Sequence, residues 1–245
     1  MGELSALSII YILLFYTAAG VFIGGVLYKI YGYATTPAPL KIPTTPAPTT
    51  TGGVVVRMAG EVLLFTSLFK GNKWTWLGGY LFHATLALVL FRHLRYFLTP
   101  PPEIVVLAGP PGVWAGVLLL GAAGYLFVRR LTVDRTKYIT SGADYFALIL
   151  IGLIALTGLV MKFIVRGDVT SIKAFMMGIV TFSWAPMPPD PMFILHLTLV
   201  ITLMVYFPFS KLMHMGGVFF SPTRNQVDDC RERRHVNPWA PDAVK

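Results

Sequence analysis

The chain has 245 residues, of which 55% are hydrophobic and 13% are charged, and its formal net charge is +9. Its mean hydropathy of +0.67 excludes a soluble domain with an ordinary polar surface, because such domains carry about 25% charged residues. Cys230 is the one cysteine, which excludes a disulfide framework and any iron–sulfur cluster built from this chain alone.

Five stretches are long and apolar enough to span a membrane, since a helix needs about 20 mainly apolar residues to cross the hydrocarbon layer. In chain order they are residues 4–28, 76–98, 113–128, 145–165 and 191–213. No basic residue precedes the first stretch and no small-residue cleavage pattern follows it, so we expect an anchor, not a cleaved signal peptide. The predicted fold class is an all-α integral membrane protein with five transmembrane helices.

The connections divide the chain further. Residues 1–30 form the first predicted span, and 31–75 form a linker in which TTPAP occurs at Thr35 and again at Thr44. Proline at this density favours extended backbone, which suits either a spacer or a strip that docks a partner. Residues 54–69 predict a helix lying in the membrane interface. Residues 76–213 hold the other four spans, and 214–245 form a polar tail.

Two connections on one side of the membrane can cover the ends of the spans. The proline-rich loop after the second span cannot form one regular helix, and residues 170–184 predict a short amphipathic helix. Basic residues set the orientation: 15 Lys and Arg fall on the side of the tail, and five fall on the other side. The positive-inside rule then places the N-terminus outside and the C-terminus in the cytoplasm, in the plasma membrane. Because topology explains the net charge, we expect no nucleic-acid partner.

Four histidines lie within or at the ends of two spans, His83 and His93 on the second and His196 and His214 on the fifth. A single buried histidine is most simply explained by a hydrogen bond to a neighbouring helix. These two spans are antiparallel, however, so His83 and His214 lie near the cytoplasmic face while His93 and His196 lie near the outer face. Two imidazoles at each of two levels predict two bis-histidine haem b groups.

Other readings of the histidines fit less well. Zinc would gather its ligands at one point, and a proton relay, which stays open, would usually add acidic residues within the spans. Eighteen residues make about five helical turns, so His196 and His214 are predicted on one helix face, whereas His83 and His93 lie roughly 80° apart. Pro208 is predicted to kink the fifth span.

The fifth span, HLTLVITLMVYFPFSKLMH at 196–214, resembles the last span of the gamma subunit of respiratory nitrate reductases. The resemblance includes FPFSK and the ten-residue spacing of His83 and His93. Within this superfamily, four segments resemble the DsrM cytochrome b subunits of the membrane complex associated with dissimilatory sulfite reduction, DsrMKJOP. They are TPAPLKIPTTPAP at 36–48, FKGNKWTW at 69–76, FRHLRYF around His93 and SPTRNQV at 221–227.

This resemblance implies two haem b groups, a quinone site, with menaquinone expected, near the outer haem, and a cytoplasmic iron–sulfur partner. That partner would resemble DsrK, which is similar to the catalytic subunit of heterodisulfide reductase and handles the sulfur carrier DsrC. Nitrate reductase gamma subunits carry a lysine near the start of the third span that contributes to the quinone site. Here no Lys or Arg occurs from 96 to 128, so Arg92, Arg95 or Glu103 is expected to replace that group.

The sequence therefore favours a quinone-linked electron-transfer subunit of an oxidoreductase complex in dissimilatory sulfur metabolism. Quinol would be oxidised near His93 and His196, and electrons would pass through the level of His83 and His214 to the partner. Two other redox assignments remain open, a nitrate reductase gamma subunit and the cytochrome b of a heterodisulfide reductase. Outside redox chemistry, the alternatives are a membrane anchor and a transporter.

Overall fold

The computed structural model describes residues 4–38 and 42–229, and helices are the only regular elements within those ranges. Five helices are long and apolar enough to cross a membrane, which confirms the predicted fold class. They are α1 (Ala6–Thr35), α4 (Lys73–His93), α6 (Gly109–Thr132), α8 (Gly142–Val160) and α10 (Pro191–Tyr206). Cys230 and the rest of the predicted tail beyond it lie outside the described residues.

Several of the long helices continue as other helical turns, and shorter helices connect them. A 3-10 turn, Leu94–Tyr96, follows α4, a π-helical turn, Met161–Val165, follows α8, and a 3-10 turn, Phe207–Phe209, follows α10. The shorter helices are α2 (Thr51–Leu63), α3 (Thr66–Gly71), α5 (Glu103–Leu107), α7 (Asp134–Ile139), α9 (Val169–Thr181), α11 (His214–Gly217) and α12 (Pro222–Asn225), with 3-10 turns at Lys211–Met213 and Val218–Phe220.

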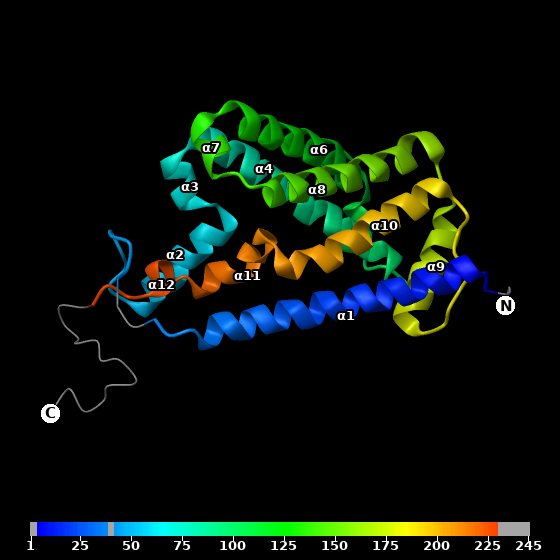
Figure 1. Ribbon diagram of the computed structural model, residues 1–245, viewed down its shortest axis with the longest axis horizontal. Coiled ribbons are helices and arrows are strands. Elements are labelled where there is room, and N and C mark those ends of the chain that lie inside the picture. The colour runs from blue at the N-terminus through cyan, green and yellow to red at the C-terminus, as the bar shows by residue number, and fades with distance from the viewer. Residues whose placement is uncertain (1–3, 39–41, 230–245) are drawn as a thin grey trace.

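The long helices pack as a curved row in which α4 contacts α6, α6 contacts α8, α8 contacts α10, and α10 contacts α1 (Figure 1). One apolar core joins α4, α6 and α8 around Phe82 and Leu119. A second joins α1, α9 and α10 around Phe175 and Leu197. Among the described helices, α4 and α10 share no contact of similar extent. Helices α4 and α10, which carry His83, His93 and His196, therefore meet through few direct contacts.

The bundle has two unlike ends (Figure 1). At the end nearest the N-terminus, called the α9 end below, α9 covers the starts of α1 and α10. Tyr16 donates its hydroxyl to the carbonyl of Ile179 (2.7 Å), and the backbone N–H of Met187 donates to the Ser8 hydroxyl (3.0 Å). At the opposite end, called the α12 end, α2, α3, α7 and α12 gather. The short helix predicted at 170–184 is thus present as α9 and covers the starts of α1 and α10.

The Thr/Pro-rich linker makes specific contacts at the α12 end. The N–H of Thr44 donates to the carbonyl of Thr223 (2.8 Å), and Arg57 donates to the carbonyl of Thr44 (2.9 Å). Arg224 of α12 forms an ion pair with Glu61 of α2 (2.9 Å). The linker and the segment after the last span are therefore bonded to each other, although they are far apart in the sequence.

Several elements differ from those predicted, and two differences have a clear physical reason. The third span begins at Gly109 and not at 113, because Pro110 and Pro111 occupy the first turn, where a missing N–H costs no hydrogen bond. The single interfacial helix predicted at 54–69 is two helices, α2 and α3. They are separated at Phe65, whose φ of 52° lies in the left-handed region and cannot continue a helix. Helix α7 was not predicted.

Candidate functional site

The four histidines come from three helices and form two pairs. His83 and His93 project from α4, His196 projects from α10, and His214 begins the short helix α11. The α12 end holds His83 and His214, whose ring centroids are 5.9 Å apart with an interplanar angle of 87°. At the α9 end, His93 and His196 are close enough to interact electrostatically. The structure thus brings together the same two pairs that the antiparallel spans predicted.

Each histidine directs one ring nitrogen at an oxygen atom. The Nδ1 atoms of His83, His93 and His214 lie 2.7, 2.6 and 2.8 Å from the backbone carbonyls of residues 79, 89 and 211. A carbonyl oxygen can only accept a hydrogen bond, so each of these three Nδ1 atoms carries the proton. In that tautomer the other nitrogen, Nε2, keeps a free lone pair.

The fourth histidine reaches the same state through a side chain. The Nδ1 of His196 lies 2.9 Å from the Thr157 hydroxyl oxygen. That hydroxyl donates its one hydrogen to the carbonyls of Leu153 (2.9 Å) and Ile154 (3.1 Å), so it accepts from His196. All four imidazoles therefore present Nε2 as an available ligand atom, which is the arrangement seen when a second contact orients a metal-binding histidine.

Aromatic and small residues shape the surroundings of the rings. Phe65 and Phe82 contact His83 edge to face, with centroids 5.1 and 5.2 Å away. On the other level, a Cβ added at Gly158 would lie 3.4 Å from Cε1 of His196, so the ring lies close against the backbone of α8. Within residues 4–38 and 42–229, no three His, Cys, Asp or Glu side chains gather as a metal site. The histidines act as pairs.

The fifth span is broken, not kinked, between its two histidines. Helix α10 ends at Tyr206, Pro208 lies in a 3-10 turn, and Ser210 has extended backbone (φ −117°, ψ 172°). The prediction that His196 and His214 share one helix face was wrong in its premise, because five continuous turns do not exist. Instead, the turn after Ser210 directs His214 toward His83.

A groove of about 470 Å³ opens at the α9 end among α4, α6 and the end of α8. Three basic side chains line it, Arg92, Arg95 and Lys162, together with apolar residues that include Trp114 and Phe163. Arg92 lies directly over Gly112, where an added Cβ would be 2.5 Å from Cδ of the arginine. The Arg92 Nε is buried and has no hydrogen-bond partner in the described part of the chain.

The groove contains one basic residue that the sequence did not assign to it. Lys162 lies in the π-helical turn after α8, far in sequence from Arg92 and Arg95, and yet it lines the same groove beside the start of the third span. Arg95 also lies over the ring of Tyr96, 5.4 Å from its centroid. Glu103, a predicted alternative, begins α5 and does not line this groove.

Residues 52–227 match the nitrate reductase gamma subunit family, and this range includes all four histidines. The chain belongs to the nitrate reductase gamma subunit family. It is thus a multi-pass membrane protein by family as well as by its five apolar helices.

Two proteins that are similar to this chain have names that specify a cytochrome and a quinol. A protein of Archaeoglobus fulgidus named "Hdr-like menaquinol oxidoreductase cytochrome b-like subunit" is 38% identical, over 92% of this chain and 82% of that protein. The protein of the same name from Archaeoglobus profundus is 33% identical, over 92% of this chain and 81% of its own length. These alignments cover most of both chains, so the similarity is not confined to the histidine segments.

Proposed function

We propose that this gamma-type subunit is the cytochrome b of a membrane menaquinol oxidoreductase complex and that it holds two haem b groups. His83 and His214 are the proposed axial ligands of one, and His93 and His196 are those of the other. The observation that carries the proposal is the shared state of the four imidazoles, each fixed through Nδ1 and each with a free Nε2. The names of the two relatives support the cofactor and the quinone.

The spacing of the α12-end pair fits a single metal between two imidazoles. A metal–imidazole bond is about 2 Å long, and the centroid of an imidazole lies about 1 Å beyond its coordinating nitrogen. Two imidazoles that share one metal would therefore have centroids about 6 Å apart, and those of His83 and His214 are 5.9 Å apart. The aromatic rings of Phe65 and Phe82 supply an apolar wall beside this position.

When bound, the two haem groups supply one-electron carriers, one at each end of the bundle. The residues of the chain determine what these carriers can do. His83 with His214, and His93 with His196, would hold these groups with two imidazoles each, which would favour electron transfer over the binding of an added ligand. The Nδ1 hydrogen bonds hold each ring in one tautomer and increase the basicity of Nε2.

The groove at the α9 end is the proposed quinone site. Arg92, Arg95 and Lys162 bring positive charge to one place beside an apolar wall. A quinol that loses its protons there develops negative charge on its oxygens, which nearby cations in a water-poor site stabilise by several kcal/mol. Lys162 supplies the basic group near the third span that the sequence between 96 and 128 lacks. Protons would leave at the α9 end, which is the outer face under the predicted topology.

The chain's one cysteine cannot build an iron–sulfur cluster, so a partner would supply it. We place that partner at the α12 end, which is the cytoplasmic face under the predicted topology. The name "Hdr-like" of the relatives favours a partner resembling heterodisulfide reductase over a nitrate reductase. The finer assignment that we propose is a DsrM-type subunit with a DsrK-like partner and, indirectly, DsrC. Two of the segments that carry this resemblance meet at the α12 end, where Thr44 is bonded to Thr223.

The experiment that tests the proposal is single-turnover reduction of the purified complex by a menaquinol analogue, followed in the b-type haem spectrum. We expect Arg92→Gln and Lys162→Gln to retain both haems and to slow reduction by about tenfold or more, since each removes a charge from the groove. Lys173→Gln, on α9 and not among the groove residues, is the control. A complex without any b-type spectrum would leave only the anchor or transporter alternatives.

A further inference from the structure

The turn that carries His214 lacks the support of a continuous helix. After Ser210 the i to i−4 ladder of α10 is interrupted, and the local bonds are short-range: the Leu212 N–H donates to the Ser210 hydroxyl (3.2 Å), and the Met213 N–H donates to the Ser210 carbonyl (3.2 Å). Bonds within a single turn do not fix its direction relative to the bundle. Contacts from other helices must do so.

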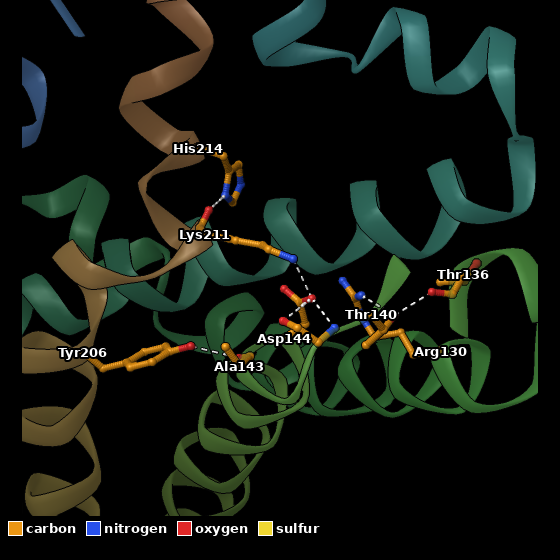
Figure 2. Close-up of polar contacts among 9 residues, drawn as sticks. Arg130, Thr136, Thr140, Ala143, Asp144, Tyr206, Lys211 and His214 are labelled. Atoms are coloured by element: carbon orange, nitrogen blue, oxygen red, sulfur yellow. Dashed lines mark hydrogen bonds and ion pairs between the residues drawn. The ribbon is translucent and has the colours of Figure 1, made fainter. Parts of the chain in front are cut away.

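Lys211 gives this turn a polar contact to another helix, and Figure 2 shows both of its hydrogen bonds. Its backbone carbonyl accepts the hydrogen bond from Nδ1 of His214 (2.8 Å), and its side-chain Nζ donates to Oδ2 of Asp144 on α8 (2.7 Å). Lys211 therefore contacts the His214 imidazole through its main chain and contacts α8 through its side chain.

Asp144 is a rigid anchor for this contact. Its Oδ2 also accepts from the backbone N–H of Ser141 (2.8 Å) and from the Ser141 hydroxyl (2.9 Å), which closes a capping box at the start of α8. The Asp144 side chain is 9% exposed, whereas that of Lys211 is 69% exposed. A second hydrogen bond joins the end of α10 to the start of α8, from the Tyr206 hydroxyl to the carbonyl of Ala143 (2.9 Å), as Figure 2 also shows.

We propose that Asp144 and Lys211 are positioning residues that set the orientation of the His214 imidazole and, through it, the properties of the proposed haem between His83 and His214, called the inner haem below. This inference rests on the proposed role of His214 as an axial ligand. The Asp144 carboxylate accepts from Lys211, and the Lys211 carbonyl accepts from Nδ1–H of His214, whose ring centroid lies 5.9 Å from that of His83. An exposed ion pair adds little to global stability, so its effect is expected on the ligand and not on folding.

The test compares Asp144→Asn and Lys211→Met with Lys211→Arg, which keeps the charge, in the purified complex. Without the ion pair between Asp144 and Lys211, the hydrogen bond from Nδ1 of His214 to the Lys211 carbonyl weakens. The Nε2 atom of His214 then becomes less basic, which favours reduced iron. We expect the midpoint potential of the inner haem to become more positive, its low-spin electron paramagnetic resonance signal to shift, and its transfer to a competing haem acceptor to quicken by up to about tenfold. The outer haem should be unchanged, and Lys211→Arg should restore all three readouts.

The control is Asp168→Asn, which alters a capping aspartate at the α9 end, where Oδ1 accepts from the Thr170 N–H (2.9 Å). If the inner haem of Asp144→Asn and Lys211→Met behaves as in this control, or if both haems are lost together, the positioning role is overturned. His214→Ala separates this failure from failure of the proposed function. A variant that retains both haems without His214 would reject the ligand assignment itself, whereas loss of the inner haem there leaves that assignment intact.

Discussion

Thr157→Val tests how much His196 depends on its Nδ1 contact, and with it the proposed haem between His93 and His196, called the outer haem below. Of the four Nδ1 partners, the Thr157 hydroxyl alone is a side chain, because the other three are backbone carbonyls that no substitution removes. Thr157 is 6% exposed, so water cannot easily replace its hydroxyl. Valine keeps the shape of threonine and deletes the acceptor. The His196 Nδ1–H is then left buried without its partner.

The size of the effect follows from that lost contact. A buried donor without a partner costs about 1–3 kcal/mol, which corresponds to roughly 5- to 150-fold in an equilibrium constant, at 1.4 kcal/mol per tenfold. This range overlaps the 10- to 100-fold loss of affinity that is typical when a second contact of a metal ligand is removed. We therefore expect the outer haem to be retained about tenfold or more weakly, while the inner haem is unaffected.

The assay is haem content and reductive titration of the purified variant under limiting haem. Thr85→Val is the matched control, because Thr85 is 7% exposed and donates to the carbonyls of Leu81 and Phe82 without contacting a histidine. If Thr157→Val keeps the outer haem as well as Thr85→Val does, with the same midpoint potential, the Nδ1 contact does not hold the ligand and the reasoning fails.

Three further changes probe other contacts. Gly78→Val should lower the free energy of unfolding by about 1–3 kcal/mol, measured by thermal unfolding, because an added Cβ would lie 2.6 Å from Tyr125 across α4 and α6; an unchanged midpoint would refute this close packing. Gly112→Ala should displace the arginine above it and slow quinol reduction with both haems retained, and wild-type kinetics would argue against the groove. Burial raises the pKa of Glu61, but bonds from Ser67 and the charge of Arg224 outweigh it and hold the pKa below its usual range. Because the pKa of Glu61 is depressed in the folded protein, its ion pair contributes its full stability above the usual carboxyl pKa. That contribution is lost as the pH falls through the lowered pKa of the folded protein. Glu61→Gln should therefore lower the free energy of unfolding at neutral pH by about 1 kcal/mol or less. It should also reduce the loss of thermal stability at acid pH, and an acid profile identical to wild type would count against the ion pair.

The sequence predicted the spans well because lipid imposes a simple rule of length and hydropathy. All five predicted stretches overlap the long helices of the structure. The start of the third span was predicted too late, since Pro110 and Pro111 were read as breakers although they occupy a first helical turn. The split at Phe65 could not be predicted, because a left-handed phenylalanine has no signature in the sequence.

The candidate site was predictable in its pairing and less so in its geometry. Antiparallel spans fix which histidines share a level, and that follows from residue order alone. The orientation of His214 does not, because it depends on a turn after Ser210 and on a contact to Asp144 of a different helix. Likewise, Lys162 enters the groove through tertiary packing of a distant π-helical turn, which no local pattern reveals.

Redox-resolved haem spectra of the four single histidine-to-alanine variants test the proposed pairing most directly. We predict that His83→Ala and His214→Ala lose the same haem and that His93→Ala and His196→Ala lose the other, because each loss opens one axial position. The haem that remains should keep its wild-type midpoint potential. Loss of one common haem in His83→Ala and His196→Ala, with the other lost in His93→Ala and His214→Ala, would contradict the two-level arrangement.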